Sequence, residues 1–245
     1  MDAGGSTAQT WAIKVQGLTK SFGHNLALRG IDIEVSHGES VVIFGPNGAG
    51  KTTLIKILAT ILKPSAGKLI VNGLEFKENP EEIRRQIGMV THQTLLYGNL
   101  TAYENLEFYC RMYDVPARQE RIHEVVGLVG MMPRLHDRVG TLSRGMQQRL
   151  SIARALLHNP TLMLLDEPET GLDPQSSSIV WDLLRQGAEK KRTVILTTHS
   201  LERGLELCDR LLILARGQIA YESSKQALDL AGLEQAYKHC TGVGA

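Results

Sequence analysis

The sequence has few cysteines, almost no net charge and no long hydrophobic run. Its three cysteines, Cys110, Cys208 and Cys240, are far apart and form no C-x-x-C pair, so neither a zinc site nor a disulfide framework is predicted. We expect reduced thiols in a cytoplasmic protein. The 27 basic and 26 acidic residues give a net charge of +1, so bulk charge does not predict nucleic acid as a partner.

No apolar segment approaches the roughly 20 residues that span a bilayer, and the N-terminus lacks a basic segment followed by an apolar core. We therefore expect neither a transmembrane helix nor an export signal, which leaves docking on a membrane protein open. Residues 1–10 are small and polar, and we expect a disordered tail there. Residues 11–245 are long enough for one large α/β domain.

A glycine-rich stretch at residues 45–53 matches the phosphate-loop pattern of Gly, four residues, Gly-Lys-[Ser/Thr]. It lies between the apolar run 41–44 and the helix-like segment 54–58. The glycines let backbone N–H groups point at phosphate oxygens, Lys51 adds a charge near the outer phosphates, and the Thr52 hydroxyl is placed to bind Mg²⁺. We predict a nucleoside triphosphate site formed by Gly45, Pro46, Asn47, Gly48, Ala49, Gly50, Lys51, Thr52 and Thr53.

The remaining pattern predicts the architecture around this loop. Short apolar segments predict a mostly antiparallel sheet beside the nucleotide strand, and helical spacing from about 94 to 159 predicts a helical insertion. Apolar runs separated by a helix then predict a buried parallel sheet, and a hairpin and a last helix follow. The fold class is therefore α/β, a P-loop NTPase (RecA-like) core with an N-terminal antiparallel β subdomain and an inserted α-helical subdomain. The predicted segments are strands 11–18, 31–35, 68–71, 162–165 and 193–198, helices 145–158, 175–190 and 225–239, and a hairpin at 211–221.

Three side chains at the predicted strand ends are candidates for chemistry. Asp166 follows four apolar residues, and phosphate loops need a second carboxylate of this kind to hold Mg²⁺. Glu167 points in another direction, because side chains alternate along a strand, and it is placed to accept a proton from an attacking water. A histidine alone is more often structural, but the position of His199 at the same sheet edge favours a catalytic role.

Two candidates stay open on the residues alone. Phe22 ends a sheet segment, where an exposed ring stacks on a purine base, although most phenylalanines lie in the core. Gln93 follows a strand at the entry to the helical insertion. Its amide either senses the γ-phosphate or its Mg²⁺, or is an ordinary solvated side chain.

Three further segments complete a recognisable set. Residues 142–146 read Leu-Ser-Arg-Gly-Met at a helix start, residues 164–168 read Leu-Leu-Asp-Glu-Pro, and residues 171–173 read Gly-Leu-Asp. With the phosphate loop, the glutamine after a strand and the strand-terminal histidine, they resemble the ATPase subunit of an ABC transporter. The resemblance covers nearly the whole chain after residue 10. Six ordered elements are specific, whereas the phosphate loop alone also fits kinases and GTPases.

The resemblance implies ATP and Mg²⁺ as ligands and assigns roles to individual side chains. Phe22 is expected to stack on adenine, and Gln93 to link the Mg²⁺ site to the helical insertion. Glu167 is expected to act as the catalytic base, and His199 to contact the γ-phosphate.

The resemblance also implies how the chain assembles. Two copies pair head to tail, so that Ser143 and Gly145 of one face the ATP held by the phosphate loop of the other. Integral-membrane transporter subunits are the further partners, and the chain is expected on the cytoplasmic face of the inner membrane.

The signature segment departs from the family pattern Leu-Ser-Gly-Gly-Gln, since Arg144 and Met146 replace a glycine and the glutamine. Arg144 either strengthens the contact to the γ-phosphate or points to solvent or the helical subdomain, and we favour the latter. Strings at 57–64, 142–150 and 166–174 are similar to the ATPase subunit of the haem exporter of cytochrome c maturation. Drug and lipid exporters share much of them. A soluble ATPase of iron-sulfur assembly and a non-hydrolysing subunit are the rival interpretations.

Overall fold

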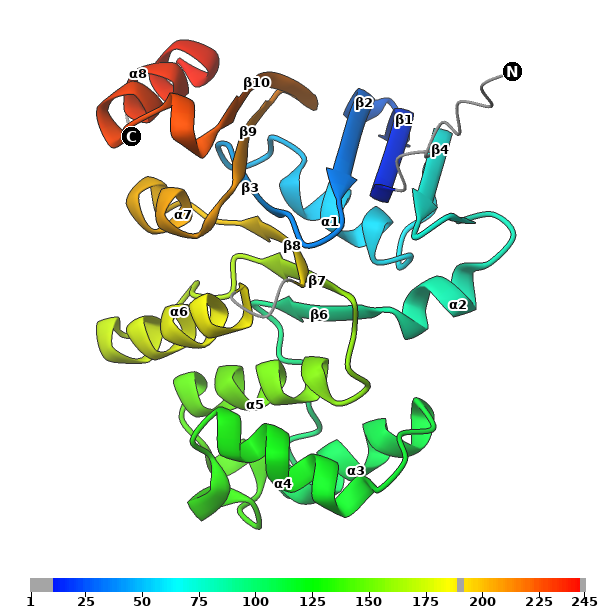
Figure 1. The fold of residues 1–245 in the computed structure, drawn as a ribbon, viewed down its shortest axis with the longest axis vertical. Coiled ribbons are helices and arrows are strands. Elements are labelled where there is room, and N and C mark those ends of the chain that lie inside the picture. The colour runs from blue at the N-terminus through cyan, green and yellow to red at the C-terminus, as the bar shows by residue number, and fades with distance from the viewer. Residues whose placement is uncertain (1–10, 189–191, 243–245) are drawn as a thin grey trace, which may run out of the picture.

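The computed structural model describes residues 11–188 and 192–242, so the expected disordered tail at 1–10 lies outside the described residues. A six-stranded sheet in the order β10-β9-β3-β8-β7-β6 forms the centre of the molecule (Figure 1). β10 is antiparallel to β9, and the other neighbouring pairs are parallel. The strands are β3 (Ser40–Phe44), β6 (Ile87–Thr91), β7 (Leu162–Asp166), β8 (Thr193–Thr197), β9 (Arg210–Ala215) and β10 (Gln218–Ser224).

A second sheet, in the order β2-β1-β4-β5, is antiparallel throughout. Its strands are β1 (Trp11–Phe22), β2 (Asn25–Ser36), β4 (Ala66–Val71) and β5 (Leu74–Glu75). β1 and β2 run on past the predicted segments, because their outer halves pair with each other through several register shifts. The predicted antiparallel subdomain is thus confirmed, with a longer hairpin than the apolar pattern indicates.

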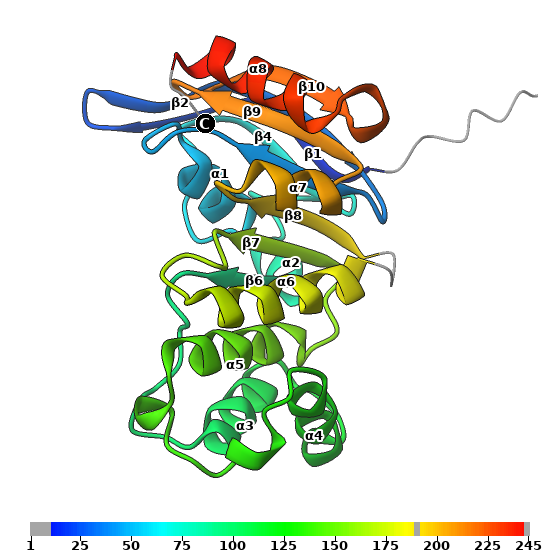
Figure 2. The ribbon, with the colours of Figure 1, turned by 90° about the vertical axis from the view of Figure 1, so that its left-hand side faces the viewer.

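Helix α1 (Lys51–Leu58) lies between the two sheets (Figure 1). Its buried residues, among them Leu54 and Ile57, join one core with residues from both sheets, such as Ile13 and Val41. All five residues of β3 and of β7 are buried, and all but Ser40 and Asp166 are apolar, as expected for strands of a parallel sheet that is covered on both faces. Helices α6 (Pro174–Ala188), α7 (Leu201–Leu207) and α8 (Leu230–Thr241) cover the other face (Figure 2).

The insertion between β6 and β7 is helical but begins later than predicted. Residue 94 lies in a segment without regular structure, and α3 (Ala102–Met112) starts only where Thr101 and Glu104 form a reciprocal capping box. The other helices are α4 (Arg118–Leu128), α5 (Arg144–Leu156) and the short turns η1 (Met132–Arg134) and η2 (Val139–Thr141). A helix before β6, α2 (Pro80–Arg85), was not predicted.

The predicted helix 225–239 is wrong in its first part. A 3-10 turn, η3 (Lys225–Ala227), is followed by an extended Leu228, and α8 begins only after Asp229. The cause is local, since the Asp229 carboxylate accepts a hydrogen bond from the Gly232 N–H (2.8 Å) and so caps a new helix. The predicted β9–β10 hairpin is confirmed, whereas the predicted end of the 175–190 helix lies outside the described residues.

Candidate nucleotide site

The phosphate loop joins β3 to α1 in a conformation that requires glycine. Gly45, Gly48 and Gly50 have φ angles of +154°, +79° and +109°. A Cβ atom at Gly45 would lie 2.2 Å from the Leu214 carbonyl oxygen, and one at Gly50 would lie 2.8 Å from that of Ala27. The loop backbone is therefore pressed against neighbouring backbone, and it curves around the N-terminal end of α1.

A cavity of about 390 Å³ lies over this loop. Its walls combine the loop with three other parts of the chain. They are formed by Phe22, Asn25, Ala27, Pro46, Asn47, Gly48, Ala49, Gly50, Lys51, Thr52, Thr53, His92 and Glu167. The predicted loop residues from Pro46 to Thr53 are thus brought together with Phe22 and Glu167, while Gly45 lies at the base of the loop.

Phe22 is not a core residue. Half of its surface is exposed, and it stands at the end of β1 on the wall of the cavity. The Lys20 ammonium lies 5.1 Å from the centre of its ring. Of the two roles that the sequence left open for Phe22, this placement favours stacking on a base over a place in the core, because the ring is exposed on the cavity wall.

Lys51 is almost completely buried at the start of α1. Its ammonium donates hydrogen bonds to the carbonyl oxygens of Gly45 (2.7 Å) and Pro46 (3.3 Å). The same nitrogen lies 3.3 Å from Oε1 of Glu167. The cation and the carboxylate therefore face each other across the floor of the cavity.

The two consecutive acidic residues face different partners. Asp166, which is 1% exposed, accepts hydrogen bonds at Oδ1 from the hydroxyls of Thr52 (3.3 Å) and Thr197 (2.8 Å). Glu167 instead lies with Oε1 2.8 Å from Nε2 of His199. Asp166 is thus a buried carboxylate beside Thr52, and Glu167 is a half-buried carboxylate beside Lys51 and His199. Oxygen donors such as Thr52 and Asp166 suit Mg²⁺, which prefers hard oxygen ligands.

The Glu167 backbone has a φ of +48°, which is uncommon for a residue with a side chain. Its N–H donates to both the carbonyl (3.0 Å) and the hydroxyl (3.1 Å) of Thr197, and these bonds hold the turn in place. The role of Thr197 was missed from the sequence. Thr197 lies two residues before His199, at the carboxyl edge of the sheet, and this position could have identified it as part of the site.

Gln93 and His92 follow β6, and only one of them reaches the cavity. Gln93 is exposed, its N–H and carbonyl both bond to the Thr91 hydroxyl, and the cavity lining includes His92 in its place. The buried Gln148 of α5 donates to the Thr91 carbonyl (3.1 Å) and ties the end of β6 to the helical insertion. No sequence pattern marked His92.

Ser143 and Gly145 lie away from the phosphate loop of their own chain, since neither lines the cavity. Ser143 caps α5, where its hydroxyl accepts a hydrogen bond from the Met146 N–H (3.3 Å). Gly145 is buried against α6, because a Cβ atom there would lie 2.1 Å from Oγ of Ser176. In a single chain these residues therefore start α5 and pack it on α6.

Arg144 is exposed but does not point freely into solvent. Its Nη2 donates to the Thr170 carbonyl (3.4 Å), and its guanidinium lies against Gly171. The sequence-based alternatives for Arg144, the γ-phosphate on one side and solvent or the helical subdomain on the other, did not include this contact, which joins the start of α5 to the segment between β7 and α6.

Glu169 is a third acidic residue in this region and was not predicted to matter. Its side chain accepts a short hydrogen bond from the Thr198 hydroxyl, next to His199. Burial raises the pKa of Glu169, and the bond from Thr198 opposes that shift. Its second carboxylate oxygen is buried and has no hydrogen-bond partner among the described residues.

A glycine-lined phosphate loop, a buried lysine and two carboxylates at the edge of a parallel sheet define a P-loop nucleoside triphosphatase. Comparisons with known proteins narrow the class. The family model described as ABC transporter matches residues 28–170, and the chain belongs to that family. It is an ATP-binding cassette, and the cassettes of the family bind ATP and hydrolyse it. The predicted fold class is confirmed.

Two curated relatives and one solved structure illustrate the similarity. The Nod factor export ATP-binding protein I of Rhizobium sp. (strain N33) is 39% identical over 89% of this chain and 72% of its own length. The linearmycin resistance ATP-binding protein LnrL of Bacillus subtilis (strain 168) is 34% identical over 88% of this chain and 70% of its own. A dimeric post-hydrolysis state of the cassette MJ0796, bound to ADP and Pi, superposes with a TM-score of 0.79 at 29% identity, covering 87% of this chain and 98% of that one.

Proposed function

We propose that the chain is the motor subunit of an ABC exporter and that Glu167 is its catalytic base. The placement of Glu167 beside Lys51 and His199, on the wall of the phosphate-loop cavity, is the observation that carries the proposal. The contact of its Oε1 with Nε2 of His199 (2.8 Å) orients the carboxylate. It then accepts a proton from water that attacks the γ-phosphate, which is general-base catalysis.

The other residues of the site bind and stabilise. The loop amides and Lys51 hold the phosphates and offset the charge that develops during phosphoryl transfer. Thr52 and Asp166 are the residues proposed to hold Mg²⁺. Gln93 is proposed as a third ligand, and its side chain would have to turn toward the phosphate loop, because it lies outside the cavity in this structure. Mg²⁺ held there would neutralise phosphate charge. Phe22 holds the adenine by stacking.

The complete site requires two copies of the chain. Ser143 and Gly145 stand at the N-terminal end of α5, away from the loop that they are expected to serve. A head-to-tail dimer puts that helix end against the γ-phosphate bound by the other chain, where the positive helix terminus favours an anion. The dimeric state of the cassette MJ0796 supports this arrangement.

An apolar groove between the parallel sheet and the helical insertion is the proposed docking site for the membrane subunits. It is lined in part by Ile61, Leu95, Tyr109 and Tyr113, and 61% of Ile61 and 46% of Leu95 is exposed. Exposed aromatic rings continue the surface, since Tyr97 packs edge-on against Phe108 and Phe108 against Tyr109.

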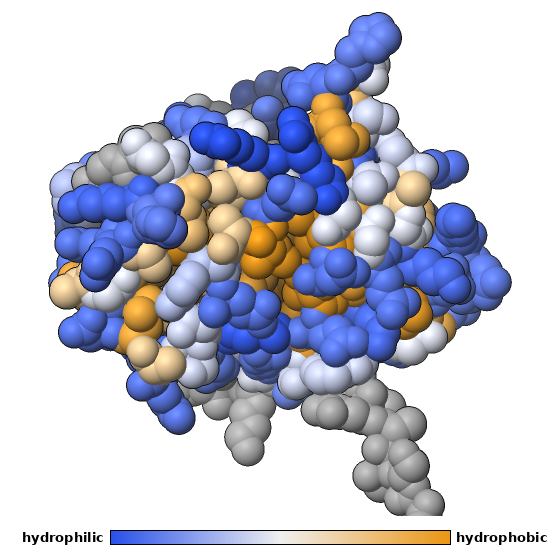
Figure 3. Space-filling view, turned by 90° about the horizontal axis from the view of Figure 1, so that it is seen from above, coloured by the Kyte–Doolittle hydropathy of each residue, from blue (hydrophilic) through white to orange (hydrophobic). Residues whose placement is uncertain are grey.

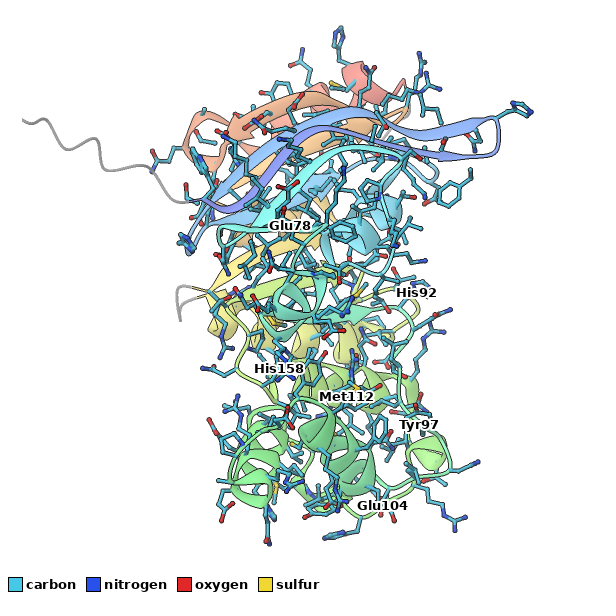
Figure 4. The ribbon with its side chains drawn as sticks, turned by 90° about the vertical axis from the view of Figure 1, so that its right-hand side faces the viewer. Glu78, His92, Tyr97, Glu104, Met112 and His158 are labelled. Atoms are coloured by element: carbon cyan, nitrogen blue, oxygen red, sulfur yellow. The ribbon has the colours of Figure 1, made fainter. Side chains whose placement is uncertain are left out.

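Figure 4 looks onto the face that carries this groove and labels Tyr97, Met112 and His158 around it. Exposed apolar side chains that gather on one surface indicate an interaction site. The end of the molecule seen in Figure 3 is by contrast mostly hydrophilic around a small apolar centre. Within the described residues, no helix is long and apolar enough to cross a membrane. We propose that separate integral-membrane subunits dock on the groove, with this chain on the cytoplasmic face of the membrane.

Export is the proposed direction because two relatives are named for the export of Nod factor and for resistance to linearmycin. Haem export is a second candidate, and it rests on the strings at residues 57–64, 142–150 and 166–174.

Purification of the full chain from native membranes tests the docking proposal. Integral-membrane subunits should co-purify with the parent and not with Ile61→Glu, while ATP binding stays intact. Leu128→Glu is the matched control, because Leu128 is a comparably exposed residue on α4 outside the groove lining. Recovery of a soluble parent without membrane chains would favour the iron-sulfur-assembly type of ATPase.

A further inference from the structure

The turn that carries Glu167 is closed by Thr170. The Thr170 N–H donates to the Glu167 carbonyl (3.1 Å), and the Thr170 hydroxyl donates to Oε2 of the Glu167 carboxylate (3.4 Å). Oε1 of the same carboxylate faces Lys51 and His199. Thr170 therefore holds the side of the carboxylate that faces away from the cavity floor.

Arg144 reaches this turn from the start of α5. Its Nη2 donates to the Thr170 carbonyl (3.4 Å), and its guanidinium lies directly over Gly171. Gly171 has a φ of +75°, and a Cβ atom there would lie 2.9 Å from Cζ of Arg144. A residue without a side chain at this place lets the planar guanidinium lie flat on the turn.

The two elements that Arg144 connects are fixed against each other. Gly145 packs on Ser176 at the start of α6. The Asp173 carboxylate accepts hydrogen bonds from the Ser176 N–H (2.9 Å) and hydroxyl (2.7 Å), which caps α6. This packing and capping fix the distance between the start of α5 and the turn at Thr170 and Gly171. The contact of Arg144 with that turn is therefore fixed as well.

We propose that Arg144 is a positioning residue for the catalytic carboxylate of its own chain, acting through Thr170 on Glu167. The inference rests on the proposed role of Glu167 as the base. It assigns the arginine of the signature segment to the rate of hydrolysis. In the proposed dimer, the signature segment of each chain faces the ATP held by the partner chain. Arg144 of that segment contacts the turn that carries Glu167 of its own chain, so Arg144 connects the two ATP sites of the dimer.

Steady-state ATPase kinetics on the full-length chain test the proposal. Arg144→Ala should lower kcat by about 3- to 10-fold and change the KM for ATP by less than about 2-fold, since only orientation of the base is lost. Thr170→Val should reproduce this split. Thr170→Ser keeps the hydroxyl and should recover most of the rate.

The Arg144→Ala/Thr170→Val double variant tests whether the two residues act together. Its kcat should fall no further than that of the worse single variant, because both residues act through the contact of Thr170 with Glu167.

Arg134→Ala is the matched control, because it removes an exposed arginine of the helical insertion whose ion pair, with Asp137, is local. Its kcat and its thermal unfolding should match those of the parent, and Arg144→Ala should unfold at the same temperature. A rise of more than about 10-fold in KM with kcat retained would show that Arg144 is a nucleotide ligand and would overturn the proposal. A parent-like kcat in Thr170→Val would overturn it as well. The two proposals fail in different ways. If Glu167 is not the base, Glu167→Gln hydrolyses ATP at the parent rate, whereas a wrong role for Arg144 does not produce that result.

Discussion

Glu167→Gln should separate ATP binding from hydrolysis most clearly. In the structure the Lys51 ammonium lies 3.3 Å from Oε1 of Glu167, and Lys51 is almost completely buried. At that distance the gross attraction is about 5 kcal/mol for an effective dielectric constant of about 20. Most of it is offset by desolvation, which leaves a net pair energy on the order of 1 kcal/mol.

The amide variant frees Lys51 for the phosphates and removes a negative charge from the cavity. ATP should therefore bind about 2- to 10-fold more tightly, while the rate of hydrolysis falls by about 10²- to 10⁴-fold because the general base is lost. Titration with a fluorescent ATP analogue measures the first effect, and phosphate release in a single turnover measures the second. Glu202→Gln, at an exposed carboxylate in the first turn of α7, is the control. Turnover of Glu167→Gln at the parent rate would refute the assignment of the base.

Three other perturbations have defined outcomes. Phe22→Ala should weaken ATP binding by about 3- to 10-fold and Phe22→Trp should not, because stacking on a half-exposed ring is worth about 1 kcal/mol; equal affinities would place the adenine elsewhere. Burial lowers the pKa of His158, whose Nε2 bonds to the Ile87 carbonyl (3.0 Å), so the stability linked to its neutral form is present above its ordinary pKa of about 6.5 and is lost as the pH falls; urea unfolding at pH 8 and pH 5 should show a smaller pH effect in His158→Asn. Burial raises the pKa of Cys110 and Cys208 to about 11, so at pH 8 a thiol reagent should label the native protein at Cys240 and label all three cysteines only after unfolding.

The sequence allows the centre of the fold to be predicted because each local signal there has one physical meaning. An apolar run before a glycine-rich loop is the buried β3, and the φ angles of Gly45 and Gly50 require the residue that the pattern shows. Asp166 emerges at the end of a buried strand for the same reason. Such positions depend on residues close in the chain, so spacing alone finds them.

Other features depend on contacts between distant segments and could not be predicted. His92 lines the cavity only because β6 ends opposite the phosphate loop. Arg144 contacts Thr170 because α5 packs on α6 through Gly145. The helix α2 was not predicted because it is too short to show a periodic pattern of apolar residues. The break before α8 was visible in principle, since Asp229 is a strong N-cap residue, but the helical spacing on both sides hid it.

The dependence of ATPase rate on protein concentration tests the composite site most directly. The proposed catalytic residues Lys51 and Glu167 lie in one cavity, whereas Ser143 and Gly145 are outside it, so one chain should bind ATP and scarcely hydrolyse it. At saturating Mg-ATP and high dilution, doubling the protein concentration should raise the total rate about fourfold, because the active species is a dimer. A rate that doubles at every concentration, down to the most dilute, would contradict a site built from two chains.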